Sequence, residues 1–349
     1  MGQQARDIND VALSTLRELG KGKVTDLSFD LTEYPFATKL VKKKKVVFGS
    51  GYEIRRQIIL DDNGSARHVG LDATDNVQTV DVMAEMIIPF RHSTSNYGWD
   101  ERILKMNREP AKLKDYLKVQ KHAGMVSMTK LVESSVWAKP ATSADVDTPW
   151  GIPMWVIKSS SGTSAASGVG GFNGQNPAGF SDSAGIDSSV QTRHANYAHT
   201  YVTVDKPDMI RKARRACRQT NFKAPVQIES YKTGDDVYGF YTVDSVIGTM
   251  ETILENQNDK LGTDLASMDG KMMFRSNPVH YVPQLDADTS NPFYGINWSV
   301  SHFMCLEGEY MEEKGPFTSD DQHNRHKMFL DLSWNFFIDE RRRCFVLSL

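Results

Sequence analysis

The stretch from residue 110 to residue 138, PAKLKDYLKVQKHAGMVSMTKLVESSVWA, constrains the fold of this chain more than any other. Asn107 suits the N-cap of a helix, Pro110 is tolerated in its first turn, and the helix should end before Pro140. At about 1.5 Å per residue the helix is roughly 40 Å long, enough to cross a whole domain. Such a helix also fits the core of an α+β enzyme. Its predicted apolar stripe has three- and four-residue steps: Leu113, Tyr116, Leu117, Ala123, Gly124, Met128 and Leu131.

The length and charge of the chain limit the classes of protein to which it can belong. Its 349 residues suffice for one large or two ordinary domains with a sizeable core. Forty-one basic and forty-four acidic residues give a net charge of −3, which argues against a dedicated nucleic-acid binder. No apolar run reaches the roughly 20 residues of a membrane span, and residues 1–10 resemble no secretory signal. The three dispersed cysteines predict reduced thiols in a cytoplasmic setting: Cys217, Cys305 and Cys344.

Alternating residues from Val46 to Leu60 predict one strand of a long hairpin. The turn is expected at Asp61-Asp62-Asn63-Gly64, because Asn-Gly accepts positive φ at both central positions. Residues 65–71 would begin the return, and residues 77–88 would form another extended stretch. Because an isolated hairpin is marginal in water, this one must rest on a neighbour. The side chains expected on one face are Phe48, Tyr52, Ile54, Ile58 and Leu60.

Other segments predict short elements and one long loop. We expect helices at residues 9–20, 206–220 and 245–257, the second of them capped by Asp205. The Gly- and Ser-rich segment 159–180 predicts a flexible surface loop. Short strands are expected at residues 238–242, 271–274, 279–282, 294–298, 303–306, 327–338 and 343–347.

Basic residues gather in two places. Lys42 to Lys45 precede the first predicted strand, where they suit a solvated edge or phosphate contact. The predicted helix 206–220 carries a basic face that suits nucleic acid, an acidic partner subunit or simple solvation. The basic residues of this face are Arg211, Arg214, Arg215 and Arg218, beside Lys212.

The sequence predicts no catalytic, cofactor or metal site. His323 and His326 lie three residues apart, but no cluster supplies a further metal ligand. His194 and His199 are interpreted as surface or packing residues. There is no Gly-x-Ser-x-Gly elbow and no phosphate-binding loop. Carboxylate pairs that meet only in space leave an α+β enzyme open as an alternative.

The order of these elements resembles the major capsid proteins of tailed bacteriophages, which have the α+β Hong Kong 97-type shell fold. The likeness extends over nearly the whole chain and rests on order and extent, because no single motif is as specific as a metal-ligand pattern. The segments that carry it are residues 96–108, the helix that follows, YGFYTVDSVIGTMETILENQND (238–259), FRSNPVHYVPQLDAD (274–288), NPFYGINW (291–298) and ERRRCFVLS (340–348).

The resemblance implies a division of the chain. A peripheral domain would combine the spine helix, the helix at 206–220 and the C-terminal strands, and an axial domain would gather around the five- and six-fold axes. The implied segments are an N-terminal arm at 1–45, an extended loop at 46–92, the peripheral strand and spine helix at 93–138, a loop insertion and second peripheral helix at 139–224, a mainly axial domain at 225–326, and peripheral strands at 327–349.

The resemblance also implies partners and a location. The chain would assemble with itself into pentamers and hexamers of an icosahedral shell, contact packaged double-stranded DNA non-specifically and meet a portal protein. It would be made in the host cytoplasm, without a cleaved segment and with no membrane partner, and would reside in the virion; scaffolding and decoration proteins are further partners. On the hairpin, the expected inter-subunit residues are Arg55, Arg56, Arg67, Asp61 and Asp62. An encapsulin-like nanocompartment shell is the alternative that shares the fold.

Overall fold

The computed structural model describes residues 36, 46–61, 64, 66–69, 82–102, 110–158, 170–221, 238–258, 272–275, 277–318, 322 and 324–349. For residues 46, 110–117 and 254–258 it describes the backbone alone. The predictions for residues 9–20, Lys42 to Lys45, Asp62, Asn107 and His323 lie outside the described residues. The described part divides into two compact units, the first of which takes residues 92–133 and 306–333. The second takes the described residues between 36 and 91, 134 and 305, and 334 and 349.

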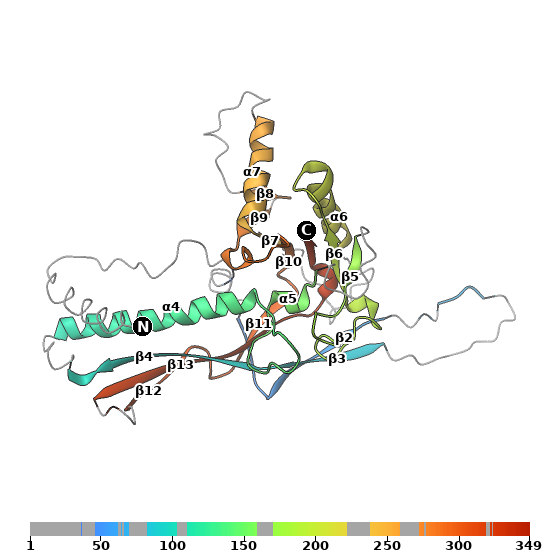
Figure 1. Cartoon of the computed structure of the whole chain (residues 1–349). Helices are drawn as coiled ribbons and strands as arrows, with labels where there is room; N and C mark the ends of the chain where they lie inside the picture. Colours follow the sequence, from blue (N-terminus) through green and yellow to red (C-terminus); the bar gives the residue numbers. More distant parts are fainter. Residues whose placement is uncertain are drawn as a thin grey trace. The chain divides into compact units, whose positions relative to one another are not determined.

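The first unit is built from long elements. Ser95 Oγ donates a hydrogen bond to the Gly124 carbonyl at 3.2 Å, which fastens a strand to the long helix. Lys121 Nζ lies 2.6 Å from Glu313 Oε1 and ties the same helix to a second strand. The first unit ends at residue 133, inside the long helix, and at residue 333, inside the strand 325–338, so both elements end in the second unit (Figure 1). The elements are β4 (Arg91–Asp100), α4 (Pro110–Val136), β12 (Glu312–Thr318) and β13 (Arg325–Ile338).

Helix α4 confirms the predicted strut, but its buried face differs from the expected stripe. Gly124 and Met128 are buried as predicted, whereas Ala123 and Leu131 are exposed. Val132, four residues after Met128, continues this buried stripe, and Val126 is buried beside it, off the stripe. Lysines on either side left the sequence pattern compatible with both faces, and packing selected this one.

The second unit is organised on a seven-stranded sheet in the order β5-β6-β14-β10-β7-β9-β8. Strands β6 and β14 are parallel, as are β7 and β9, and the other neighbours run antiparallel. Helix α6 contacts β6 and β14. The strands are β5 (Gly171–Gly174), β6 (Asn196–Thr200), β7 (Tyr238–Thr242), β8 (Met273–Phe274), β9 (Asn277–Tyr281), β10 (Phe293–Asn297) and β14 (Phe345–Ser348).

Aromatic rings form the core of this sheet. Phe240 on β7 stacks on Phe293 of β10 at 5.6 Å between centroids, and Phe293 stacks on Phe345 at 6.3 Å. Gly295 lies opposite Phe345 in the register, and a Cβ there would come within 2.2 Å of the Phe345 ring. Gly295 is therefore required so that the ring can cover the backbone.

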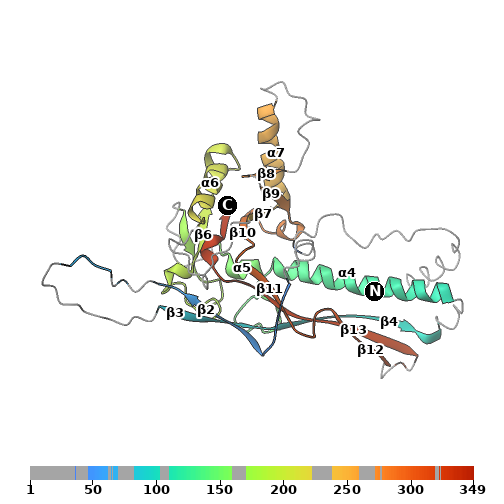
Figure 2. The same cartoon turned by 180° about the vertical axis from the view of Figure 1, so that it is seen from behind.

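Smaller elements complete the second unit. The strand β11 (Ser301–Leu306) pairs with the C-terminal half of β13, with Ser301 opposite Ile338, and β1 (Val46–Gly49) lies on the other side of β11. The remaining elements are α5 (Ile152–Trp155), α6 (Arg211–Gln219), α7 (Asp244–Asn258), the short helices η2 (Thr192–His194), η3 (Lys206–Ile210), η7 (Pro283–Leu285) and η8 (Arg341–Arg343), and the strand pair β2 (Glu53–Ile59) and β3 (Met83–Pro89) (Figure 2).

Two sequence predictions are wrong in this unit. The Asp61–Gly64 segment does not close a tight hairpin, because β2 pairs with β3, Glu53 opposite Pro89 and Ile59 opposite Met83. Residues 66–69, part of the expected return, are not a strand. Gly171–Gly174, expected to be loop, forms the edge strand β5 against β6. Asn-Gly and Gly-rich sequences indicate only that the local backbone is flexible. They do not indicate which strand will pair with which, because the partner strand lies elsewhere in the sequence.

Candidate functional site at the β2–β3 hairpin

The β2–β3 hairpin has one buried and one exposed face. Ile54, Met86 and Ile88 are buried, which confirms the predicted inward direction of Ile54. Phe48 and Tyr52, expected on the same side, are 54% and 95% exposed. They precede β2 or lie in β1, so the alternation of β2 does not extend to them.

The opposite face of the hairpin is open to solvent. Ile59 is 52% exposed, its cross-strand partner Met83 is 48% exposed, and Ile87 is 37% exposed. Single exposed apolar residues are ordinary, but three on one face of a two-stranded sheet make a candidate contact surface. We call this surface the hairpin outer face; it consists of Arg55, Gln57, Ile59, Met83, Glu85 and Ile87.

Arg55 lies in the middle of the hairpin outer face and has partners within its own chain. Its Nε lies 2.8 Å from Glu53 Oε1, and its Nη1 lies 3.4 Å from Glu85 Oε2. The hydrogen bond to Glu53 and the charge of that carboxylate raise the pKa of Arg55. The pairs are exposed, so a charged group of another chain can exchange with them at little cost.

The other predicted contact residues are dispersed. Arg56 is on the inner side, where its guanidinium lies 5.5 Å from the centroid of the Phe337 ring. Arg67 is exposed beyond the end of β2. Asp61 is exposed just after the C-terminal end of β2, a place that we call the hairpin root. Its Oδ1 lies 2.9 Å from Arg193 Nη2. Of the predicted contact residues that the structure describes, Arg55 is the one on the hairpin outer face.

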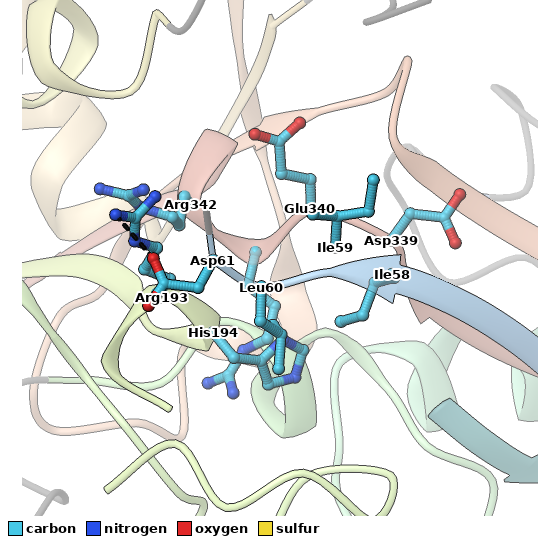
Figure 3. A pocket seen from close by; sticks show the side chains of 10 residues that line it. Ile58, Ile59, Leu60, Asp61, Arg193, His194, Asp339, Glu340 and Arg342 are labelled. Carbon is cyan, nitrogen blue, oxygen red and sulfur yellow. Dashed lines mark ion pairs between the residues drawn. The ribbon is translucent and has the colours of Figure 1, made fainter. Parts of the chain in front are cut away.

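A pocket of about 230 Å³ lies at the root of the hairpin (Figure 3). One wall is the end of the hairpin, Ile58 to Asp61, and the facing wall is residues 339–342. Arg193 and His194 complete the lining, and the dashed line in Figure 3 is the ion pair between Arg193 and Asp61. Burial and the charge of Arg193 lower the pKa of Arg342, so cationic groups crowd this pocket.

Arg341 forms the buried base of this region. Its side chain is 1% exposed and donates to the carbonyl oxygens of Trp155 at 2.7 Å, Gly174 at 3.0 Å and Gln175 at 2.7 Å. Further donors point to Ser183 Oγ and Ser188 Oγ at 3.2 Å and 2.9 Å. Burial lowers the pKa of Arg341 to about 9. One guanidinium thus joins η8 to α5, β5 and the segment before β6.

His194 and His199 are packing residues, as one of the two sequence interpretations had it. His194 is 3% exposed and His199 is 5% exposed. Burial and the charge of Arg341 lower the pKa of His194 well below its usual value. The imidazole of His194 is therefore neutral at physiological pH.

Helix α6 presents the predicted basic face. Asp205 caps the preceding turn, since its Oδ1 accepts a hydrogen bond from the Asp208 backbone N–H at 2.7 Å, and Lys212 pairs with Asp208. Ala213, Ala216 and Cys217 are buried on the other side of the helix. The exposed residues are Arg211, Arg214, Arg215 and Arg218.

Groups capable of chemistry do not form a reactive arrangement where the structure describes them. His92 Nδ1 lies 2.5 Å from Ser333 Oγ, which also contacts Glu309. Here the serine stands between histidine and carboxylate, whereas nucleophile activation places the histidine between the other two. Burial raises the pKa of Cys217 to about 11 and that of Cys305 to about 12, so both thiols are protonated.

In the part of the chain that the structure describes, no cluster of three or more His, Cys, Asp or Glu side chains could hold a metal ion. Of the helices described, none is both long enough and apolar enough to cross a membrane.

Comparison with known proteins identifies the fold. No family model and no curated protein matches the sequence. A chain of the cyanophage A-1(L) capsid matches with a TM-score of 0.61 and 14% identity, covering 95% of this chain and 97% of that chain. The capsid of the native GTA particle matches with a TM-score of 0.56 and 10% identity, covering 96% and 98%. The SrpI encapsulin complex from Synechococcus elongatus PCC 7942 matches with a TM-score of 0.50 and 11% identity, covering 97% and 94%.

These matches extend over almost the whole of each chain, so they concern the complete arrangement of elements. The chain has the α+β Hong Kong 97-type capsid fold, which confirms the fold predicted from the order of its segments. At sequence identities of 10–14%, the structural matches establish the fold alone. The roles of single residues must be argued from the geometry described above.

Proposed function

We propose that this chain is the major capsid protein of a tailed bacteriophage and self-assembles into the icosahedral head. The observation that carries the proposal is the match to the cyanophage A-1(L) capsid over 95% of this chain. The hairpin outer face supports it, because Ile59, Met83 and Ile87 leave apolar surface exposed beside exchangeable ion pairs. The proposed role is structural rather than enzymatic.

Assembly would proceed by heterologous contacts that close into pentamers and hexamers. In this proposal residues 46–92 lie over an adjacent subunit, the N-terminal arm 1–45 crosses a subunit boundary, and residues 225–326 gather around the symmetry axes. Arg55, Arg56 and Arg67 would meet acidic groups of a neighbour, and Asp61 and Asp62 basic groups. A near-neutral subunit suits an inner wall that encloses DNA without holding it tightly.

The remaining partners follow from the same proposal. The shell would enclose double-stranded DNA through non-specific contacts that include Arg211, Arg214, Arg215 and Arg218. It would meet a portal protein and either a separate scaffolding protein or none, with decoration proteins as an outer addition. Assembly would occur in the host cytoplasm, and the product would be the virion.

An encapsulin-like nanocompartment shell is the second candidate function. The match to the SrpI encapsulin complex over 97% of this chain favours it. The two candidates differ in what the particles enclose. Particles isolated with their neighbouring gene products should contain DNA and a portal if the chain is a phage head protein, and a cargo enzyme if it is a nanocompartment.

Negative-stain electron microscopy of the expressed protein, after a sizing column, tests both shell functions together. We expect closed particles tens of nanometres across, or pentamers and hexamers. A clean monomer or dimer, unchanged by crowding and by co-expressed neighbouring genes, would contradict the proposal and favour the α+β enzyme.

Substitutions on the hairpin outer face test how the subunits join. Ile59→Asp should abolish shells and change the free energy of unfolding of the subunit by at most about 1 kcal/mol, because Ile59 is half exposed. Reversing the charges of Arg55 and Arg67 should have the same outcome. Val202→Asp is the matched control, since Val202 is 78% exposed and lies outside the hairpin. Normal shells from Ile59→Asp, or lost shells from Val202→Asp, would exclude this surface.

A further inference from the structure

A groove of about 320 Å³ lies between the basic helix and α7, away from the hairpin. We call it the α6–α7 groove. Both views show α6 and α7 standing next to each other (Figure 1, Figure 2). Its apolar walls come from η3, α7 and the segment around β8, and its rim carries Lys206 and Arg214. The apolar lining residues are Ile210, Met250, Ile253, Met272, Met273 and Phe274.

The walls of the α6–α7 groove suit a protein ligand. Met250 and Phe274 are each 7% exposed and form the base, whereas Met273 is 54% exposed at the opening. Three methionines line the same groove. Unbranched thioether side chains change shape at low cost, and protein surfaces that accept varied apolar segments use them for this reason.

The rim of the groove is cationic. Lys206 and Arg214 are exposed, and neither forms an ion pair with another residue that the structure describes. Lys212, one turn away, instead pairs with Asp208. None of the described lining residues is acidic. An occupant must therefore bring both apolar side chains for the walls and carboxylates for the rim.

We propose that the α6–α7 groove binds an acidic amphipathic segment of another protein chain. Leucine-like side chains would enter between Ile253 and Met273, and acidic residues flanking them would pair with Lys206 and Arg214. Helical segments place such residues three and four positions apart, which matches a groove between two helices. DNA would use the cations but leave the apolar walls without a partner.

This proposal goes beyond shell formation and concerns the subunit itself. The test begins with a displayed library of random peptides of roughly 16 residues, about four helical turns, selected on the full-length protein. Selected peptides are then labelled, and fluorescence anisotropy measures their binding to the wild type and to three variants. Arg214→Glu alters the rim and Met273→Glu alters a wall. Arg218→Glu is the matched control, because it makes the same charge change on the same helix outside the groove.

We expect the selected peptides to combine carboxylates with apolar residues three and four positions apart. Arg214→Glu and Met273→Glu should each weaken binding at least about tenfold, and Arg218→Glu less than about threefold. Circular dichroism confirms that each variant is folded. Selection of no such peptides, or equal losses from Arg214→Glu and Arg218→Glu, would overturn the proposal. Displacement of the peptide by a DNA duplex at about 0.15 M salt would assign the groove to nucleic acid and overturn it as well.

Discussion

The β2–β3 hairpin and the seven-stranded sheet are both built from β-strands rich in apolar residues, but they differ in how much of that apolar surface they bury. In the sheet, every residue of β7 and β10 is buried, and rings such as Phe240 and Phe293 stack inside one subunit. In the hairpin, alternate residues of each strand face outward, and Ile59 and Met83 on that side are half exposed. The sheet buries its own apolar surface within the subunit, whereas the hairpin leaves part of its apolar surface exposed.

Under the proposed function, this difference predicts that stability depends on the sheet and assembly on the hairpin outer face. Substitutions in the sheet should unfold the subunit before they affect any contact between subunits. Substitutions on the hairpin outer face should spare the subunit and affect assembly. A protein that must fold first and associate later benefits from keeping these two properties in separate strands.

Removing the Arg341 side chain should have the largest effect on the sheet side of this comparison. Arg341→Met keeps much of the volume but leaves the carbonyls of Trp155, Gly174 and Gln175 without their donor. We expect the free energy of unfolding to fall by at least about 3 kcal/mol, measured by denaturant unfolding of the isolated subunit. Arg341→Lys should show an intermediate loss, because one ammonium cannot reproduce the fork. If Arg341→Met lowered the free energy of unfolding by less than about 1 kcal/mol, the guanidinium would not be important for the stability of the fold.

Acid should weaken the sheet through His194. Its pKa is well below 6.5 in the fold, and the unfolded chain binds a proton near the ordinary value of about 6.5. Stability is therefore lost as pH falls below about 6.5, with a slope of up to about 1.4 kcal/mol per pH unit. His194→Gln should remove that part of the slope in unfolding experiments between about pH 5 and pH 7. The pKa of His199 is also lowered, mainly by burial, so some slope should persist. An unchanged slope would mean that His194 does not titrate on unfolding.

Breaking the ion pair at the hairpin root should have the smallest effect. Asp61 and Arg193 have side chains that are 58% and 50% exposed, so water screens their interaction. Asp61→Asn should cost about 0–1 kcal/mol in the free energy of unfolding, determined by the same denaturant method. A loss comparable to that of Arg341→Met would show that the hairpin root belongs energetically to the sheet, and the proposed separation would fail.

Local sequence signals predicted the elements whose pattern lies within one segment. The strut helix α4, the capped helix after Asp205 and the strand β7 were all predicted, because spacing, caps and apolar residues lie side by side in the sequence. The partner of β2 was not predicted correctly, since Ile59 pairs with Met83 across a long separation. Strand β12, which carries no large apolar alternation, was not predicted.

The candidate site was predictable only in part. Arg55 was predicted to be an inter-subunit residue and lies on the hairpin outer face, whereas Ile59 and Met83 on the same face were not singled out. Arg341 stands in the charged run ERRR at residues 340–343, yet it is buried. Arginine in a run of charged residues normally indicates a solvated turn, and only the tertiary structure brings the acceptors of Trp155 and Gly174 to it. The α6–α7 groove joins three separate segments and had no sequence signal.

The parallel pairing of β6 with β14 has a consequence for synthesis of the protein. β6 comprises residues 196–200 and β14 residues 345–348, so the ribosome completes one strand long before its neighbour exists. At about 5–20 residues per second, this interval lasts roughly 7–30 s. During that time β6 has β5 on one side only, and the edge that later receives β14 is open to other nascent chains. We expect the yield of folded protein in a cell to rise with the chaperone capacity available during translation.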